Sequence, residues 1–280
     1  MPYYQSLGLI PPKRHTANRV SPGYKGEGLY YEEVVTTHGF SRAYSIVYHL
    51  RPPTRVKSVE PAGRIKIETV ADLPLRHVHT KSGAMPAKGD PVTGRVPLFA
   101  NGDVVMSRCR PIEPQAELFR NASADEIIFV HRGTGRLITM FGVVPIRPFD
   151  YVVIPRTTTY QLEFDTGSNP DLLVIEAVGN LGFPPRYLNP DGQFRMGAPF
   201  AERDLHGPRE TNVIDREGDT AILIKDGERL TRYVMAHHPF DVVGWDGMVY
   251  PFTFNADDFE PITGTIHQPP PIHQTFETNG

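Results

Sequence analysis

Hydrophobic and polar residues alternate with a period near two across much of residues 104–178. The alternation is clearest in three segments, at residues 104–109, 137–141 and 160–164. Neighbouring side chains of a β-strand point to opposite faces, so each segment predicts a half-buried strand. Glycine-containing turns separate the segments at the short intervals typical of antiparallel sandwiches and barrels, not of βαβ units. The pattern therefore predicts an all-β protein built around an antiparallel barrel.

The regions on either side of this barrel show weaker patterns. Of the first sixty residues only 43–50 form a clear apolar segment, which predicts an irregular N-terminal arm. Residues 184–208 contain five prolines and little periodicity. Such a long connection is expected to cross between domains, to embrace a neighbouring subunit, or to be a plain surface loop. Strand-like segments return at 220–224 and 231–235.

Composition and charge narrow the classes of function. The chain has 29 Lys plus Arg against 32 Asp plus Glu, without a run of five or six like charges, which argues against nucleic-acid binding. The single cysteine, Cys109, cannot form an internal disulfide, and its apolar strand predicts an inert core residue. No apolar run approaches twenty residues and no signal peptide is evident, so we expect a cytoplasmic protein without a membrane segment. Its substrate should be small.

Residues 125–135 followed by 149–155 have the layout of the two halves of a cupin motif, a small double-stranded β-helix. Within it, Gly133-Thr134-Gly135 is predicted to be a hairpin turn, because without a following helix it cannot serve as a phosphate loop.

A metal-binding cupin carries a His-x-His pair, a carboxylate and a later histidine, which point into the barrel together. The corresponding positions here hold Asn121, Ser123, Glu126 and Tyr160. One carboxylate among neutral groups is a poor site for a divalent ion, so we expect a metal-free barrel.

Two histidine pairs do not suggest a metal site. His77 and His79 have suitable spacing but loop-like flanks and no nearby glutamate, so they are predicted to be an ordinary surface pair. His237 and His238 should point to opposite faces of a strand and so cannot bind one ion together. Sequence motifs of serine hydrolases, P-loop nucleotidases, zinc fingers and zincins are absent.

His267 is the candidate catalytic residue. It precedes a triple proline, and a stiff extended backbone suits an acid/base group that must hold its position. Its spacing to His273 would place both on one strand face, but the prolines interrupt that regularity. A histidine with a reference pKa near 6.5 could accept or return a phenolic proton at neutral pH.

Several motifs along the whole chain resemble one enzyme family. They are Tyr3–Gly8, Pro11–His15, Gly133–Gly135, Val243–Gly247 and Tyr250–Asn255. On these residues the chain resembles the N-terminal two-thirds to three-quarters of a bacterial homogentisate 1,2-dioxygenase. The resemblance implies a bicupin fold, in which an N-terminal β-sandwich with a degenerate cupin precedes a C-terminal cupin that carries iron.

Applied to this chain, the resemblance implies an N-terminal β-rich domain at 1–255, with its metal-free cupin at about 104–178. Residues 256–280 would begin a truncated second cupin. On this view the strand-like residues 274–278 would be an exposed edge without partner strands.

The resemblance also implies a reaction. The family uses Fe(II), held by two histidines and a glutamate, to cleave homogentisate with O2 to maleylacetoacetate in phenylalanine and tyrosine catabolism. The family's acid/base histidine falls on His267, and the iron ligands would lie beyond Gly280. We therefore expect this chain to hold neither metal nor cofactor ligands and to be inactive alone.

The family further suggests trimers paired into hexamers, with residues 184–208 as the candidate intersubunit arm. Two other interpretations stay open. One is a metal-free cupin barrel that acts as a binding or assembly module. The other is a cupin isomerase that uses only acid/base groups, which is weakened because the sequence assigns no inward-facing pair of carboxylates or lysines.

Overall fold

A computed structural model describes residues 3–20, 28–40, 42–68, 77–260 and 274–279. Within these ranges the helical structure consists of four single turns of 3-10 helix: η1 Ser82–Ala84, η2 Pro185–Tyr187, η3 Glu202–Asp204 and η4 Ala256–Asp258. No helix in the described part of the chain is long and apolar enough to cross a bilayer. Nearly all regular structure is strand, so the prediction of an all-β protein is confirmed.

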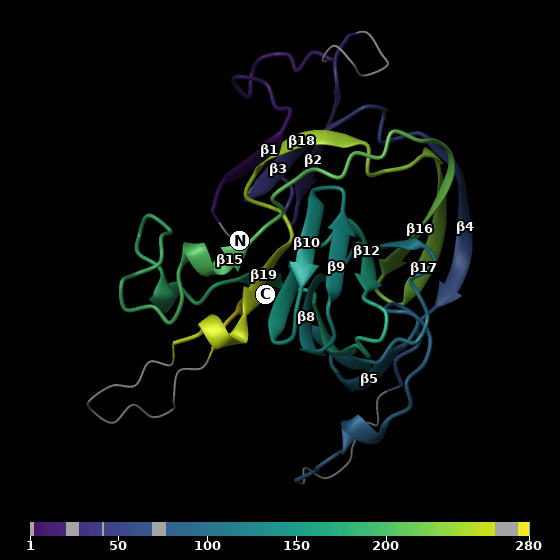
Figure 1. The fold of residues 1–280 in the computed structure, drawn as a ribbon, viewed down its shortest axis with the longest axis vertical. Helices are drawn as coiled ribbons and strands as arrows, with labels where there is room; N and C mark the ends of the chain where they lie inside the picture. Colours follow the sequence, from purple (N-terminus) through teal and green to yellow (C-terminus); the bar gives the residue numbers. More distant parts are fainter. Residues whose placement is uncertain (1–2, 21–27, 41, 69–76, 261–273, 280) are drawn as a thin grey trace.

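Eight consecutive strands form the centre of the molecule (Figure 1). They are β6 Val104–Cys109, β7 Leu118–Asn121, β8 Asp125–Arg132, β9 Gly135–Thr139, β10 Gly142–Ile146, β11 Asp150–Ile154, β12 Thr159–Phe164 and β13 Asp171–Ala177. One sheet contains the order β10-β9-β12-β7, and the other contains β11-β8-β13-β6. This is the strand order of a jelly roll, the double-stranded β-helix on which cupins are built. The predicted cupin-like fold is therefore confirmed.

The connection at Gly133-Thr134-Gly135 differs from the prediction. Strands β8 and β9 lie in opposite sheets, so the connection is an arch between sheets, and the predicted hairpin is wrong. Gly133 has a φ of 112°, and a Cβ there would lie 2.9 Å from the Cα of Pro170. The hairpin instead joins β9 to β10 through Met140 and Phe141. Alternation along a strand does not reveal which sheet the next strand joins.

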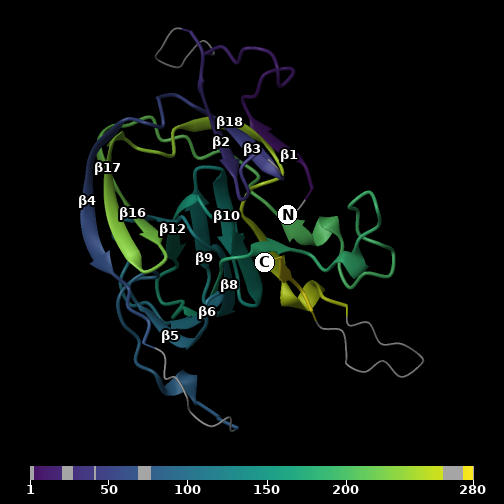
Figure 2. The same cartoon turned by 180° about the vertical axis from the view of Figure 1, so that it is seen from behind.

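Strands from outside the jelly roll extend both of its sheets. The sheet with β7 gains β16 Glu217–Asp226, β17 Arg229–His237 and β4 Val56–Arg64, which curve along one side of the molecule (Figure 2). The other sheet gains β5 Arg95–Ala100 at one edge, and β19 Phe252–Asn255 with β15 Leu205–His206 at the opposite edge. Strand β16 pairs with β7 in parallel, with Lys225 beside Asn121. Residues more than a hundred positions apart thus share the barrel interior.

A separate four-stranded sheet lies against one end of the barrel. Its order is β1-β18-β3-β2, from β1 Gln5–Gly8, β18 Val242–Gly247, β3 Tyr44–His49 and β2 Tyr31–Thr36. The N-terminal region was predicted to be an irregular arm with one apolar segment at 43–50. That segment is β3, and the prediction of an irregular arm is wrong for β1 and β2. Strand β1 pairs with β18, which is distant in sequence, so no local pattern reveals it, whereas β2 pairs with the next strand, β3. The indole N–H of Trp245 in β18 donates to the carbonyl oxygen of Phe141 at 2.8 Å and ties this sheet to the barrel.

The last described residues form a strand that pairs with an earlier segment of the chain. Strand β20, Glu277–Asn279, lies antiparallel to β14, Asn180–Gly182. Phe276 packs edge-on against Tyr151, with ring centroids 5.6 Å apart. The expectation that this segment lacks a partner strand is therefore wrong, because the partner comes from the loop after β13.

Residues 184–208 form a lobe that includes η2, η3 and β15. Tyr187 and Phe200 in this lobe are buried, and Phe200 packs against Phe254 of β19 with ring centroids 4.6 Å apart. A plain surface loop is therefore excluded. Contact with another subunit stays a prediction.

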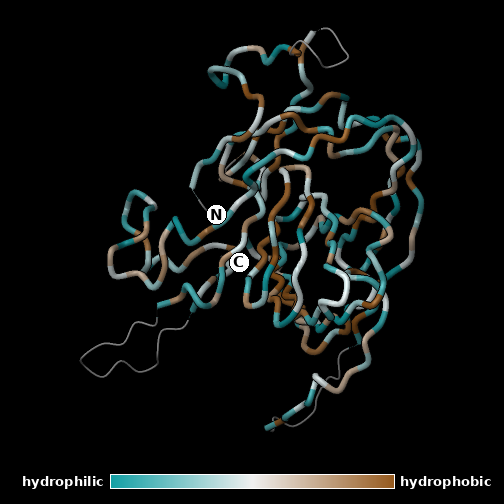
Figure 3. Tube along the Cα trace, in the orientation of Figure 1, coloured by the Kyte–Doolittle hydropathy of each residue, from teal (hydrophilic) through white to brown (hydrophobic). Residues whose placement is uncertain are grey.

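Apolar residues concentrate along the barrel strands and thin out in the outer loops (Figure 3). Two main cores result. One fills the jelly roll, and the other lies between the barrel, the four-stranded sheet and the 184–208 lobe. The jelly-roll core is closed at one end by charged side chains, which form the candidate site.

Candidate functional site

Two glutamates meet inside the barrel. Glu126 on β8 and Glu176 on β13 are directly opposite each other in the antiparallel register, and their residues are 0% and 6% exposed. Like charges in that position destabilise a sheet, and a buried carboxylate is costly unless it is paired. The pair can persist only because cations reach it.

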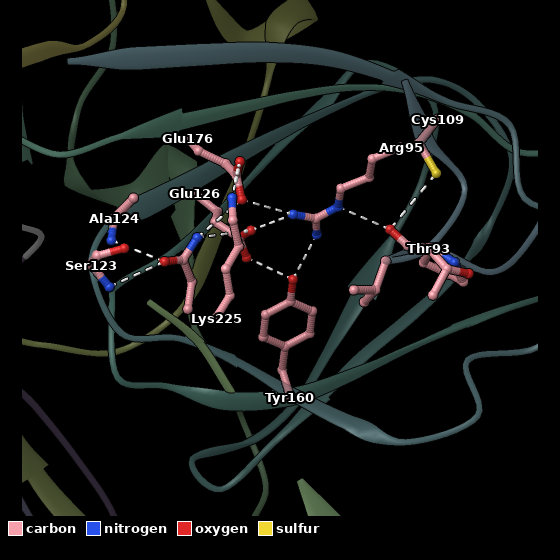
Figure 4. Close-up of polar contacts among 12 residues, drawn as sticks. Thr93, Arg95, Cys109, Ser123, Ala124, Glu126, Tyr160, Glu176 and Lys225 are labelled. Atoms are coloured by element: carbon pink, nitrogen blue, oxygen red, sulfur yellow. Dashed lines mark hydrogen bonds and ion pairs between the residues drawn. The ribbon is translucent and has the colours of Figure 1, made fainter. Parts of the chain in front are cut away.

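Arg95, which β5 places at the rim of the same sheet, supplies the first cation (Figure 4). Its Nη1 lies 2.5 Å from Oε1 of Glu126 and 3.2 Å from Oε1 of Glu176. Its Nη2 donates to the hydroxyl oxygen of Tyr160 at 2.9 Å. Burial alone would lower the pKa of Arg95, but Glu126, Tyr160 and Glu176 raise its pKa well above the usual value. The guanidinium is a permanent charge between the two carboxylates.

Lys225 and Asn121 reach the glutamates from the opposite sheet. The Nζ of Lys225 donates to Oε2 of Glu176 at 2.5 Å. The Nδ2 of Asn121 donates to Oε1 of Glu176 at 3.1 Å and to Oε1 of Glu126 at 3.4 Å. Because both sheets contribute, the interaction holds the two walls of the jelly roll together. We call these six residues the barrel cluster: Arg95, Asn121, Glu126, Tyr160, Glu176 and Lys225.

Tyr160 completes the barrel cluster by donating its hydroxyl to Oε2 of Glu126 at 2.6 Å. Burial raises the pKa of Tyr160 well above its usual value, and the neighbouring Glu126 adds to the shift. Burial alone would also raise the pKa of Glu126, but Arg95 and the Tyr160 hydroxyl lower it overall. At neutral pH Glu126 is therefore ionised and Tyr160 is a proton donor.

The structure brings together three of the four positions compared with a metal-binding cupin. Asn121, Glu126 and Tyr160 meet as predicted. The side chain of Ser123 does not join them, because its Oγ accepts a hydrogen bond from the backbone N–H of Gly227, while its own backbone N–H donates to Oδ1 of Asn121 at 3.2 Å. The expectation of one carboxylate among neutral groups is wrong, since Glu176 is a second one.

Arg95, Glu176 and Lys225 were missed by sequence reasoning. Glu176 lies two residues after Val174, and Lys225 two residues after Leu223, so both continue a core-facing series. That spacing was a usable signal. The objection to an acid/base cupin, that no inward carboxylate pair or lysine could be assigned, does not hold for this structure.

The barrel cluster does not fit a ferrous ion. Each carboxylate oxygen of Glu126 and Glu176 accepts at least one hydrogen bond from Arg95, Asn121, Tyr160 or Lys225. An iron ion would have to displace two fixed cations. Across the described ranges, no three His, Cys, Asp or Glu side chains are grouped so that they could hold a metal ion.

The other candidate histidines are spread across the molecule. His77 and His79 are exposed, as predicted for a surface pair. His237 lies 3.7 Å from the carboxylate of Asp241, whereas Nδ1 of His238 accepts the backbone N–H of Phe240, so the two do not converge.

His267 and His273 lie outside the described residues. Cys109 is fully buried, and burial raises its pKa to about 11, which confirms the prediction of an inert core thiol.

Comparison with known proteins settles the family. The family model described as "Homogentisate 1,2-dioxygenase N-terminal" matches residues 105–256, more than half of the chain. A Saccharolobus solfataricus protein named "Putative dioxygenase SSO1533" is 37% identical over 280 residues, which cover 99% of this chain and 70% of that protein. The chain belongs to the homogentisate 1,2-dioxygenase family.

More distant members are similar over nearly the same span. Homogentisate 1,2-dioxygenases of Rhodopseudomonas palustris (strain BisB5) and Bradyrhizobium diazoefficiens are each 25% identical, over 95% of this chain and 61% of their own length. The chain thus spans about three-fifths of these relatives. Among solved structures, a "Cupin 2 conserved barrel domain protein from Leptotrichia buccalis" has a TM-score of 0.28 at 10% identity, covering 57% of this chain and 88% of that one. The jelly-roll order of the strands identifies the fold.

In this homogentisate 1,2-dioxygenase family member, the Gly244-Trp245-Asp246-Gly247 motif is a packing device. A Cβ on Gly244 would lie 2.4 Å from the backbone nitrogen of Leu9. Gly247 has a φ of 149°, and its Cβ would lie 2.4 Å from the backbone of Ser45. Strand β18 can therefore lie between β1 and β3 only with glycine at both positions.

Asp246 of the same motif anchors the N-terminal segment. It accepts hydrogen bonds from the Tyr4 hydroxyl at 2.9 Å and from Nε of Arg14 at 2.7 Å. The motifs at the two ends of the resemblance thus meet in one place, away from the barrel cluster.

Proposed function

We propose that this chain acts as part of an iron(II)-dependent dioxygenase that cleaves the ring of homogentisate with O2. The product would be maleylacetoacetate, in the breakdown of phenylalanine and tyrosine. The observation that carries the proposal is the family match over residues 105–256, together with relatives similar along nearly the whole chain.

Within that enzyme, the described region serves as scaffold. The carboxylates of the barrel cluster are already bound by Arg95 and Lys225, so they offer no free position for a metal. We propose that the iron ligands are side chains other than those described. The domain organisation follows, with residues 1–255 around a barrel at about 104–178 and residues 256–280 leading into the second cupin.

We propose that His267 is the acid/base residue of the reaction. Its role would be to take the phenolic proton of the hydroquinone and to return a proton later, which suits an imidazole at neutral pH. The support is its match to the family's acid/base histidine and its position before the triple proline.

Oxygen uptake with homogentisate tests these proposals on the enzyme isolated from its native source and loaded anaerobically with Fe(II). We expect homogentisate-dependent uptake, and His267→Gln should lower kcat by roughly 10²- to 10⁴-fold. The matched control is His273→Gln, which should leave kcat within a few-fold. Full activity in His267→Gln would remove the proton-transfer role, and no uptake with homogentisate would remove the substrate assignment.

The isolated 280-residue chain provides a second arm. We expect it to bind no stoichiometric ferrous ion and to consume no O2 with homogentisate. Tight one-to-one iron binding by this chain would contradict the proposal that the iron ligands are not among its residues.

We also propose that the protein is a homo-oligomer, a trimer or hexamer, in which the 184–208 lobe meets a neighbouring subunit. Met196 in this lobe is fully exposed, so a substitution there probes the surface of the lobe without disturbing its core. Met196→Glu should lower the sedimentation coefficient, whereas Val78→Glu on another exposed loop should not. An unchanged oligomer in Met196→Glu would count against this surface.

A further inference from the structure

A cavity of about 230 Å³ lies inside the barrel against the barrel cluster. Its walls are largely apolar, and they include Phe119, Leu223 and Leu230. At one end the lining changes to charged side chains, from Arg95, Glu176 and Lys225. An apolar chamber with a few convergent polar groups is the usual form of a small-molecule site.

The cavity has a way in from the surface. A second, outer hollow of about 490 Å³ shares four lining residues with it: Ile67, Val105, Glu176 and Lys225. The outer hollow is bordered by the β5–β6 turn at residues 100–104 and by Gly227 and Glu228 after β16. A ligand could therefore pass between the two sheets and reach Lys225.

More cationic than anionic side chains line the cavity. Arg95 and Lys225 line it, but of the two carboxylates only Glu176 does. Glu126 is fully buried and hydrogen-bonded to Tyr160 and Arg95. The four charges of the barrel cluster balance in number, but a ligand in the cavity meets both cations and only one of the two carboxylates, an arrangement that favours an anion.

Lys225 has hydrogen-bonding capacity to spare. An ammonium group has three donors, and among the described residues the hydrogen bond found for its Nζ goes to Glu176. Arg95 is more fully occupied, because it bonds Glu126, Glu176, Tyr160 and the carbonyl oxygen of Pro91. Lys225 is therefore the direct contact for an anion, and Arg95 contributes mainly its charge.

We propose that this barrel binds a small aromatic monocarboxylate, with its carboxylate on Lys225 and its ring against Phe119, Leu223 and Leu230. The inner volume is below the roughly 300–1,000 Å³ typical of drug-sized ligands, so a single-ring acid is the class that fits. This site is additional to the ring-cleaving centre and does not depend on the proposed reaction.

Isothermal titration calorimetry of the full 280-residue chain tests the ligand class with phenylacetate as the probe. We expect one-to-one binding. Benzyl alcohol has the ring without the carboxylate, and acetate has the carboxylate without the ring, so each should bind at least tenfold more weakly. Equal binding of benzyl alcohol would overturn the role of Lys225, and absence of phenylacetate binding at millimolar concentration would overturn the site.

Substitutions of opposite expected effect locate the site. Glu176→Gln keeps the side-chain shape but removes the anion that competes for Lys225, so phenylacetate should bind about tenfold more tightly. Lys225→Met should weaken binding at least tenfold. The matched control is Lys57→Met on the exposed face of β4, which should leave affinity unchanged.

A folding control keeps this test decisive. Lys225→Met alone leaves Glu176 with one fewer partner, so the double variant Lys225→Met with Glu176→Gln removes both charges of the pair. It should unfold near the wild-type temperature and still fail to bind phenylacetate. Wild-type affinity in the double variant, or weaker binding in Glu176→Gln, would refute the proposal.

Discussion

The barrel cluster and a second charged group, beside the four-stranded sheet, both pair buried carboxylates with cations, but they use different cationic side chains. We call the second group the histidine cluster: Glu33, His49, Arg51, His237 and Asp241. In it, Nδ1 of His49 lies 2.7 Å from Asp241 and Nε2 lies 3.2 Å from Glu33. Burial alone would lower the pKa of His49, but Asp241 and Glu33 raise it to about 9. The barrel cluster uses Arg95 and Lys225 in the same role.

The comparison separates fixed charge from conditional charge. An arginine keeps its proton at every pH that a protein tolerates, so its attachment to the barrel carboxylates is permanent. A histidine with a pKa near 9 loses its charge in mildly alkaline solution. In mildly alkaline solution the stability of the barrel should therefore stay constant. The junction between β2, β3 and the segment before β18 should lose stability over the same pH range.

Arg95→Met should produce the largest loss of stability. It leaves Glu126 and Glu176 buried and facing each other, with Lys225 in contact with Glu176 alone, and breaking a buried pair in this way costs about 3–5 kcal/mol. Urea unfolding followed by circular dichroism measures the change. A loss of unfolding free energy below about 1 kcal/mol would mean that water reaches the glutamates and that Arg95 is not needed to keep them buried.

Raising the pH should weaken the histidine cluster next most strongly. The folded-state pKa of His49 is about 9 against roughly 6.5 in the unfolded chain, so its stabilisation is complete below pH 6.5 and is lost as pH rises towards 9. The expected decrease is on the order of 3 kcal/mol.

Unfolding free energies measured between pH 6 and pH 10 test this dependence. His49→Gln should remove most of the slope, whereas Arg95→Met should keep it. Equal slopes in wild type and His49→Gln would show that another group titrates.

Tyr160→Phe should have an intermediate effect. The change removes the hydroxyl that donates to Glu126 and accepts from Arg95, without altering the shape of the ring. A lost hydrogen bond to a buried charged group costs about 1.5–3 kcal/mol. Tyr31→Phe, at an exposed position, is the matched control and should be neutral in the same chemical denaturation.

Lys57→Met sets the lower limit of the series. Lys57 on β4 pairs with Asp219 on β16, across the intervening strand β17, but both side chains are more than half exposed. Such pairs contribute about 0–1 kcal/mol and are screened by salt. A larger loss in thermal unfolding would mean that burial does not separate the clusters from ordinary surface pairs.

The sequence predicted the barrel better than its contents. Alternation identified the strands at 104–109 and 160–164 because each pattern is local. Glu126 and Tyr160 were placed inside through the cupin layout. Lys225 was not, because β16 reaches the barrel by pairing with β7, which is distant in sequence. Arg95 was not placed either, although its strand β5 pairs with the next strand along the chain, β6.

The same limitation explains the errors at the two ends of the described chain. Strand β1 exists because β18 pairs with it, and β20 exists because β14 does. Period-two patterns of three or four residues carry too little information to predict such partners. By contrast, the Gly244–Gly247 motif was recognised, and only the structure shows that its glycines admit neighbouring backbones.

The contact between Trp245 and Phe141 gives the molecule a built-in optical probe. Trp245 is the only tryptophan in the sequence and is fully buried, with its indole hydrogen-bonded across the boundary between the four-stranded sheet and the jelly roll. Its emission should shift to longer wavelength as soon as that boundary admits water, even while the barrel strands persist. Detachment of the four-stranded sheet from the jelly roll would thus be detected as a red shift of the Trp245 fluorescence before global unfolding.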